Sequence, residues 1–464
     1  MNLEKYHQLL GRFLVVVVLA STAWANWKEK VLYSFQGGTD GAVPTGAVVL
    51  DQAGNLYGVT NQGGAANCSP IAYCGTVFQL APPVKSGDPW TETVLYIFKG
   101  KKFNDGEYPE GGLVSDAAGN LYGTTGYGGA GDCVLLGILG GCGTVFELSP
   151  PQQKGGAWKE TILYSFPTAK QGYVPAGDLV FDGAGNLYGA TLFGGGQGTT
   201  CDPFYQYCGE VFKLSPPTKK GGKWPEKVLH RFSGGTDGAN PNGGLIIDSK
   251  GVIYGTTATG GNQGCKTSAS LGCGTAFLLK PPGNQGLPWT ERMLHIFTDG
   301  NDGAGPNGGL IFSTKGSLYG TGGGGGSGNG FGVVFQLTQA KSGRWGETVL
   351  HSFQGSDGRD PVAPVTLDSS GNLYGTANAE GTHFGGTLFR LKQPIGSTRK
   401  WVFAVLYDFA GPPDAEFPAS RLIFGKGGAL FSTTQSGGSG QACQGGCGTV
   451  FRVQPDAVCT SYCP

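Results

Sequence analysis

The chain has 464 residues and no net formal charge, with 32 basic and 32 acidic residues. Only 14% of the residues are charged, so the sequence lacks the basic face on which nucleic-acid binding rests, and we expect no nucleic-acid partner. Glycine accounts for 88 residues without a three-residue period, a content typical of either disorder or many tight turns. The regular strand patterns described next favour turns.

Residues 1–25 have the pattern of a secretory signal peptide. Lys5 and Arg12 precede an apolar run over 13–20, and the segment ends in Ala23-Trp24-Ala25, with small residues where a signal peptidase reads them. The alternative is a retained membrane anchor, but the apolar run is far shorter than the roughly 20 residues that a spanning helix needs. We predict cleavage after Ala25, a secreted extracellular protein and no membrane span in the mature chain.

Residues 26–455 contain seven copies of one unit, and each copy opens with a tryptophan. These residues are Trp27, Trp90, Trp158, Trp224, Trp289, Trp345 and Trp401. In the first copy, the residue pattern over 27–35 has a period of two, which predicts a strand. One face of this strand carries Trp27, Glu29, Val31, Tyr33 and Phe35, and the other carries Lys28, Lys30, Leu32 and Ser34. The apolar segment ending at Asp51 and the segment starting at Leu56 predict a tight hairpin, because turn residues separate them. A third strand over 75–80 follows, so each unit holds four short strands.

Four-stranded units repeated every 56 to 68 residues fit the blades of a β-propeller and exclude a helical solenoid. We predict an all-β, seven-bladed propeller with antiparallel blades, in which the N-terminal strand completes the last blade beside the strand over 448–453. A linear array of seven small sheets is the alternative, but it would leave edge strands and apolar faces in water. Two aromatic positions recur in every copy and predict an aromatic layer between blades. They are Tyr57, Tyr122, Tyr188, Tyr254, Tyr319, Tyr374 and Phe431, and Phe78, Phe146, Phe212, Phe277, Phe335, Phe389 and Phe451.

The twelve cysteines form six close pairs in the sequence. They are Cys68 and Cys74, Cys133 and Cys142, Cys201 and Cys208, Cys265 and Cys273, Cys443 and Cys447, and Cys459 and Cys463. Five pairs lie in the loop between the second and third strands of a blade, and the sixth lies in a short tail over 456–464. Secretion and the even count favour local disulfides. The alternative is a four-thiolate zinc site made by the last two pairs.

The loops that enter the first strand of a blade repeat an Asp-Gly unit. The aspartates are Asp40, Asp105, Asp237, Asp302 and Asp357, whereas the third copy has Lys170-Gln171-Gly172. Because strand direction alternates, these loops lie on the same side of the ring as the cysteine-containing loops, and this face is the candidate ligand-binding face. A ring of carboxylates suits calcium, since hard cations take oxygen ligands. The simpler interpretation is a turn, and apart from this calcium hypothesis we predict no cofactor or metal.

No catalytic residue can be assigned from the sequence. His230, His295 and His351 fall where other copies have tyrosine, which indicates packing rather than a metal ligand or base. The chain has no Gly-x-Ser-x-Gly, HExxH or phosphate-binding Gly-x-x-x-x-Gly-Lys-Ser/Thr motif. The visible departures from the repeat are Phe403, Arg421, Glu380 and His383, and they form no recognisable constellation.

The recurring segments GNLYGTT, GTVFEL and WKETILYSF, over 119–125, 143–148 and 158–166, resemble the GloVer tandem repeat of bacterial "choice-of-anchor" proteins. The resemblance covers nearly all of 26–453 and implies an extracellular bacterial repeat protein without an established biochemical activity. The Gly-Asn-Leu-Tyr hairpin alone is similar to that of propeller lactonases and strand synthases, which gather a metal at the ring centre.

Two hypotheses for function follow. The first is a monomeric extracellular binding or scaffold module that presents its loop-rich face to a carbohydrate or a protein. The second is a lactonase-type or carbohydrate-active enzyme with its site at the central opening. An enzyme requires polar residues at that opening that break the repeat, and a scaffold requires none.

Overall fold

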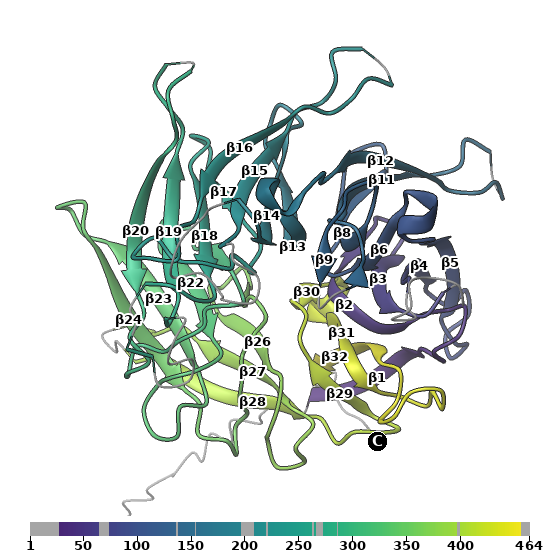
Figure 1. The fold of residues 1–464 in the computed structure, drawn as a ribbon. Helices are drawn as coiled ribbons and strands as arrows, with labels where there is room; N and C mark the ends of the chain where they lie inside the picture. Colours follow the sequence, from purple (N-terminus) through teal and green to yellow (C-terminus); the bar gives the residue numbers. More distant parts are fainter. Residues whose placement is uncertain are drawn as a thin grey trace, which may run out of the picture.

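Seven antiparallel sheets form a closed ring in the computed structural model, and each sheet is one blade of a β-propeller (Figure 1). The blades follow one another along the chain and have four strands each, or five where the first strand is split. The structure describes residues 27–64, 74–135, 138–153, 155–195, 208–219, 221–261, 264–265, 272–284, 286–396 and 400–455. The predicted signal peptide and the tail over 456–464 lie outside these residues.

The strands of the first four blades have the following bounds. Blade 1 contains β2 (Ala42–Leu50), β3 (Leu56–Gln62), β4 (Thr76–Ala81) and β5 (Thr91–Ile97); blade 2 contains β6 (Gly106–Pro109), β7 (Val114–Ser115), β8 (Leu121–Gly128), β11 (Thr144–Ser149) and β12 (Lys159–Ser165). Blade 3 contains β13 (Tyr173–Phe181), β14 (Leu187–Phe193), β15 (Glu210–Leu214) and β16 (Glu226–Arg231); blade 4 contains β17 (Ile246–Ile247), β18 (Ile253–Thr257), β19 (Thr275–Lys280) and β20 (Thr290–Ile296).

The remaining elements complete the ring. Blade 5 contains β21 (Leu310–Phe312), β22 (Leu318–Gly322), β23 (Val333–Gln339) and β24 (Trp345–Ser352); blade 6 contains β25 (Thr366–Leu367), β26 (Leu373–Ala377), β27 (Thr387–Lys392) and β28 (Val402–Asp408). Blade 7 contains β29 (Ala415–Pro418), β30 (Ile423–Phe424), β31 (Leu430–Gly437), β32 (Thr449–Pro455) and β1 (Trp27–Ser34). A two-stranded ribbon, β9 (Val134–Leu135) and β10 (Ile138–Leu139), and three 3-10 turns, η1 (Lys101–Phe103), η2 (Ala169–Gln171) and η3 (Lys426–Gly428), lie in the connections.

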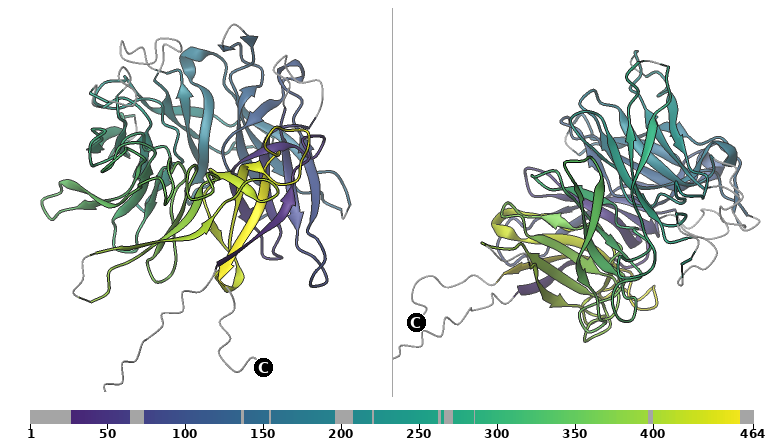
Figure 2. Two further views of the ribbon diagram at one scale, coloured as in Figure 1. Left: turned by 90° about the horizontal axis from the view of Figure 1, so that it is seen from below. Right: turned by 90° about the vertical axis from the view of Figure 1, so that its left-hand side faces the viewer.

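The ring is closed by its two ends, as the sequence predicts. β1 pairs with β32 in antiparallel register from Trp27 opposite Pro455 to Ser34 opposite Thr449. The purple N-terminal strand therefore lies against the yellow C-terminal strands (Figure 2, left). This pairing supplies the outer strand of blade 7, so no blade lacks its fourth strand.

The first strand of each blade is irregular where it approaches the preceding blade. The residue before a recurring proline has a left-handed backbone with φ between 53° and 65° in all seven copies: Val43, Tyr108, Val174, Asn240, Gly305, Asp360 and Phe417. Each of these residues donates its N–H to a carbonyl of the preceding blade at 2.8–3.1 Å. The backbone turns toward the neighbouring blade at this point, which interrupts or shortens the pairing with the second strand.

Phenylalanine pairs fill the boundaries between blades and confirm the predicted aromatic layer. The phenylalanine after each outer strand packs edge-on against the third-strand phenylalanine of the next blade, with ring centroids 5.0–5.3 Å apart. The pairs are Phe35–Phe78, Phe98–Phe146, Phe166–Phe212, Phe232–Phe277, Phe297–Phe335, Phe353–Phe389 and Phe409–Phe451, and every member is buried. This edge-to-face geometry is favoured by the ring quadrupoles.

One side-chain prediction for the outer strand is wrong. Strict alternation places Leu32 on the face shared with Lys28 and Lys30, yet Leu32 is buried. The cause is a β-bulge between Val31 and Tyr33, which adds a residue to β1 and turns Leu32 inward. Every outer strand has a register shift at the same place.

Candidate functional site

A cavity of about 490 Å³ lies on the axis of the ring and is lined by residues from all seven blades. Its inner wall is built from a segment of three residues that follows the recurring proline in each blade. The second of these three residues is small, and the first strand continues after the third. The small residue is glycine in five copies, and its neighbours explain why. A Cβ at Gly111 would lie 2.3 Å from the carbonyl oxygen of Gly177, and one at Gly243 would lie 2.5 Å from the nitrogen of Gly309.

The third position of this segment is uncharged in five blades and charged in two. The seven residues are Ala47, Gly112, Asp178, Gly244, Gly309, Pro364 and Arg421. Asp178 in blade 3 accepts the N–H of Gly112 at 2.8 Å and forms an ion pair with Arg421 in blade 7 at 3.5 Å. Because blades 3 and 7 are not neighbours, this ion pair crosses the axis. Both residues also line a smaller cavity of about 210 Å³, so the pair separates the two spaces.

Glu110 is the one charged residue at the first position of the segment, where the other copies have Thr45, Ala176, Asn242, Asn307, Val362 and Ala419. It lines the cavity, and burial raises the pKa of its carboxyl to about 7. Burial also raises the pKa of the adjacent Tyr108, and the charge of Glu110 raises it further. The amides of Asn242 and Asn307 reach the same wall.

Two more amides come from the ends of second strands in neighbouring blades, Asn61 on β3 and Gln435 on β31. The Oδ1 atom of Asn61 and the Nε atom of Arg421 are buried and have no hydrogen-bond partner among the described residues. Leaving such groups unsatisfied costs about 1–3 kcal/mol each. The cavity therefore combines a guanidinium, carboxyl groups and amides with unused hydrogen-bonding capacity.

The Asp-Gly aspartates lie between blades and not on the wall of this cavity. Each accepts a hydrogen bond from the repeated tyrosine or histidine of the preceding outer strand, or lies close to it. The pairs are Tyr33–Asp40 at 3.0 Å, Tyr96–Asp105 at 2.8 Å, His230–Asp237 at 3.8 Å, His295–Asp302 at 3.0 Å and His351–Asp357 at 2.8 Å. Tyr407 donates to Asp414 in the same way at 2.9 Å. Asp40 also accepts the N–H of Gln36, which is the turn role that the sequence favours.

A glutamate from the next outer strand joins each of these pairs at five of the seven boundaries. Burial and then the charge of the adjacent aspartate raise the pKa of Glu29 to about 8 and of Glu92, Glu160 and Glu347 to about 7. The fifth is Glu291, whose pKa burial also raises to about 7. Each has a buried Oε1 atom without a hydrogen-bond partner among the described residues. We call these five groups the interblade glutamates.

The third copy lacks the aspartate and compensates with a different carboxyl group. Glu210 on β15 occupies a position that is threonine in most copies and forms an ion pair with Arg231 at 3.2 Å. A Cβ at Gly172 would lie 2.5 Å from its Oε1 atom, so Glu210 reaches the loop where the aspartate is missing. Burial raises the pKa of Glu210 to about 7.

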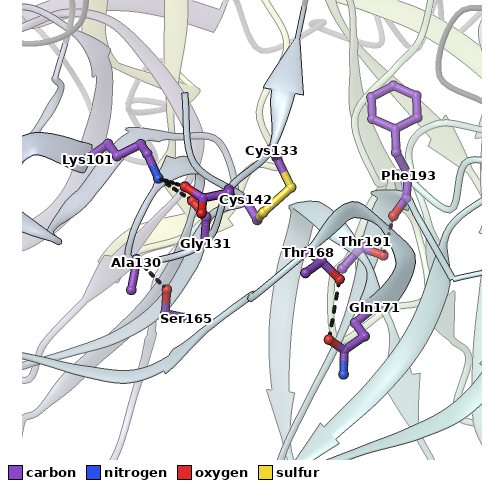
Figure 3. The surroundings of a disulfide bond; sticks show 11 residues. Lys101, Ala130, Gly131, Cys133, Cys142, Ser165, Thr168, Gln171, Thr191 and Phe193 are labelled. Atoms are coloured by element: carbon purple, nitrogen blue, oxygen red, sulfur yellow. Dashed lines mark hydrogen bonds and ion pairs between the residues drawn. A yellow bond between two sulfur atoms is a disulfide. The ribbon is translucent and has the colours of Figure 1, made fainter. Parts of the chain in front are cut away.

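The described cysteines are disulfide-bonded as predicted. The bonds Cys133–Cys142, Cys265–Cys273 and Cys443–Cys447 close loops of the same kind in blades 2, 4 and 7. Cys74 and Cys208 are disulfide-bonded as well, whereas Cys68, Cys201, Cys459 and Cys463 lie outside the described residues. Near the first bond, Lys101 of η1 reaches the carbonyl of Gly131 and the carboxylate of Asp132 (Figure 3).

The four departures noted in the sequence lie in different places. Arg421 lines the cavity, whereas Phe403 takes the place of an interblade glutamate and stacks on His351 with ring centroids 3.6 Å apart. Glu380 forms an ion pair with Arg359, and the exposed His383 lies 3.5 Å from Asp408. Sequence reasoning missed Glu110 and Asp178. A comparison of the seven segments that follow the recurring proline would have found them.

The model of the Gloeobacter/Verrucomicrobia repeat matches residues 18–201, 133–344, 197–403 and 346–462, which together span the whole propeller. The chain belongs to this repeat family. The membership confirms the resemblance seen in the sequence motifs. Within the described part of this Gloeobacter/Verrucomicrobia repeat protein, no helix is long and apolar enough to cross a membrane.

Comparison of this Gloeobacter/Verrucomicrobia repeat protein with curated proteins finds no significant match. Among solved structures, a calcium-containing structure of the Trichoderma reesei carbohydrate-active enzyme family AA12 is 13% identical, with a TM-score of 0.46 over 93% of this chain and 96% of the other. A putative oxidoreductase (glucose dehydrogenase) from Thermus thermophilus is 14% identical, with a TM-score of 0.42 over 92% and 100%. Similarity at this level says nothing about what this chain binds.

Proposed function

We propose that this protein is an extracellular binding module whose central cavity holds a polyhydroxylated ligand such as a sugar unit of a glycan. The observation that carries the proposal is the break in the repeat at the cavity wall. Glu110, Asp178 and Arg421 stand where the other blades have uncharged residues, and closing the ring does not require them. A plain scaffold would need no such departures.

The polar groups of the wall suit hydroxyl groups, each of which donates and accepts. Arg421 and the cavity amides supply donors, while Asp178 and Asn61 supply acceptors. Val43, Val362 and Pro364 add apolar surface for the C–H faces of a sugar ring. The volume of about 490 Å³ falls in the range of roughly 300–1,000 Å³ that is typical of small-molecule sites.

The extracellular location is part of this proposal. Disulfides persist in oxidising compartments, and three are formed within the described residues. The signal-peptide pattern over 1–25 supports export by the same route. Mass spectrometry of the N-terminus of protein collected from the culture medium tests it, and an intact Met1 on a cell-retained chain would contradict it.

Glycan-array screening of the full chain with its disulfides formed, followed by calorimetry on the best ligand, tests the binding role. We expect Arg421→Ala and Asp178→Asn each to weaken binding at least about tenfold, because each removes a charge-assisted hydrogen bond. Arg359→Ala is the matched control, since Arg359 is as exposed as Arg421 and is also ion-paired but lies outside the cavity. Binding that survives both cavity substitutions would place the ligand on the loops and contradict the proposal.

Glu110 favours a second candidate function, a carbohydrate-active enzyme of the same cavity. A carboxyl group whose pKa is about 7 is partly protonated at neutral pH and can act as a general acid. Release of reducing ends from the bound glycan, abolished by Glu110→Gln with binding retained, would support catalysis. Binding without any turnover would leave the binding module as the function.

A further inference from the structure

One boundary between blades brings three side chains together that can share a cation. His230 comes from β16 at the edge of blade 3, Asp237 from the loop that enters blade 4, and Glu291 from β20 at the edge of blade 4. One ligand atom from each residue lies within 4.8 Å of the other two. The three side chains are 17–19% exposed, so they are largely buried.

The imidazole of His230 stands between two carboxyl groups and forms an ion-pair contact with each of them. His230 Nε2 lies 3.3 Å from Glu291 Oε1 and 3.8 Å from Asp237 Oδ2. Nε2 and Oε1 are both buried and without a hydrogen-bond partner among the described residues. Asp237 is held in place from the other side, because it accepts the N–H of Ser233 at 2.8 Å and its hydroxyl at 2.6 Å.

The equivalent boundaries of the same chain show the contrast. Where the first residue is tyrosine, its hydroxyl donates directly to the aspartate, as Tyr96 does to Asp105 at 2.8 Å. His295 also bonds its aspartate directly, at 3.0 Å, and His351 has Phe403 where a glutamate would stand. Within the described residues, the grouping of three ligand atoms occurs only at His230. The His230 trio therefore differs from its equivalents in placing one imidazole nitrogen between two carboxyl groups without a hydrogen bond to either.

We propose that His230, Asp237 and Glu291 bind one divalent transition-metal ion of the zinc class at the boundary between blades 3 and 4. Two ligands at about 2.1 Å from a tetrahedral ion lie ~3.4 Å apart, which is close to the 3.3 and 3.8 Å found here. Imidazole and carboxylate ligands suit zinc, and two carboxylates balance its charge. A water molecule completes the coordination. The proposal is independent of the ligand of the central cavity.

Calorimetric titration of zinc into the tag-free full chain, with its disulfides formed and after treatment with EDTA, tests the site. We expect one zinc ion per chain and a rise in Tm on binding. His230→Tyr should fold, because the chain itself has tyrosine at this position in four other copies, and it should weaken binding at least about tenfold. His295→Tyr is the matched control and should bind zinc as the wild type does.

Glu291→Gln is a second variant for the case in which His230→Tyr does not fold, and it should weaken binding similarly while preserving shape. The proposal is overturned if the wild-type chain binds no zinc, or if the folded variants bind it unchanged. Zinc binding that survives His230→Tyr and disappears in His383→Ala would assign the ion to the exposed His383 beside Asp408, which also overturns it.

Discussion

From the raised pKa values of the interblade glutamates, we predict that the free energy of unfolding of the ring decreases as the pH rises above about 5. The boundary between blades 6 and 7 is the strongest case, because Glu29 on the closing strand faces Asp414, which already accepts the hydroxyl of Tyr407. Burial and the charge of Asp414 raise the pKa of Glu29 from 4.5 to about 8. A hydrogen bond between the two carboxyl groups requires one proton, which the folded state holds and the unfolded chain releases.

The sign and the size of the effect follow from this difference in proton affinity. Since the folded-state pKa is above the unfolded value, the stabilisation is complete below about pH 4.5 and is lost as the pH rises toward 8. At about 1.4 kcal/mol per pKa unit, the ceiling for Glu29 is about 5 kcal/mol, and partial solvent access reduces this to about 1–2 kcal/mol. Five such groups together make a loss of several kcal/mol, a large part of ordinary domain stability.

Thermal unfolding between pH 4.5 and 8.5 at constant ionic strength measures this dependence. We expect Tm to fall across the range, and Glu29→Gln to raise stability at pH 8 by about 1–2 kcal/mol with little change at pH 5, because glutamine donates to Asp414 without a titrating proton. Glu147→Gln is the control, since Glu147 faces the hydroxyl of Ser149 and not a carboxylate. A Tm that is constant or increases from pH 5 to 8 would refute the reasoning.

Three further predictions concern the frame of the ring. Replacing Cys133 and Cys142 together by serine should cost about 2–3 kcal/mol in chemical denaturation, and an unchanged midpoint would contradict the loop-closure argument. Gly111→Ala should lower Tm, because the new Cβ would lie 2.3 Å from the carbonyl of Gly177, whereas Gly346→Ala enters open space and should be neutral. Deleting β1 exposes β32 as an edge, so we expect aggregation in size-exclusion chromatography; a monodisperse monomer would mean that blade 7 holds without its closing strand.

Most of the fold was predictable because the same sequence pattern recurs in seven copies. The tryptophan spacing, the hairpin at Asp51 and the two recurring aromatic positions each predict local structure, and the order of strands predicts the closure by β1. The hairpin shows how local this information is, since Asn55 donates to both carboxylate oxygens of Asp51 within a five-residue turn. Burial alone would raise the pKa of Asp51, but these hydrogen bonds outweigh it and hold the pKa below its usual value.

The details that sequence reasoning missed depend on contacts between distant residues. Alternation cannot reveal the bulge that buries Leu32, because a strand with an extra residue looks like a strand of normal period. The hydrogen-bond partners of the Asp-Gly aspartates are side chains of the preceding blade, which the Asp-Gly motif does not reveal. The cavity pair Asp178 and Arg421 is separated by more than 200 residues, and neither side chain belongs to a local motif.

In a chain of similar repeats, a residue that departs from the repeat pattern is informative only when its neighbours in the structure are known. Phe403 departs from the repeat and still serves packing, because it stacks on His351 in the space of the missing glutamate. Glu210 departs and restores a carboxyl group where the third copy lost one. Asp178 and Arg421 compensate for nothing in the ring, since five other blades close with uncharged residues at the same position. Asp178 also accepts the N–H of Gly112 from the neighbouring blade, but five blades close without a charge at this position, so we expect a ligand in the central cavity.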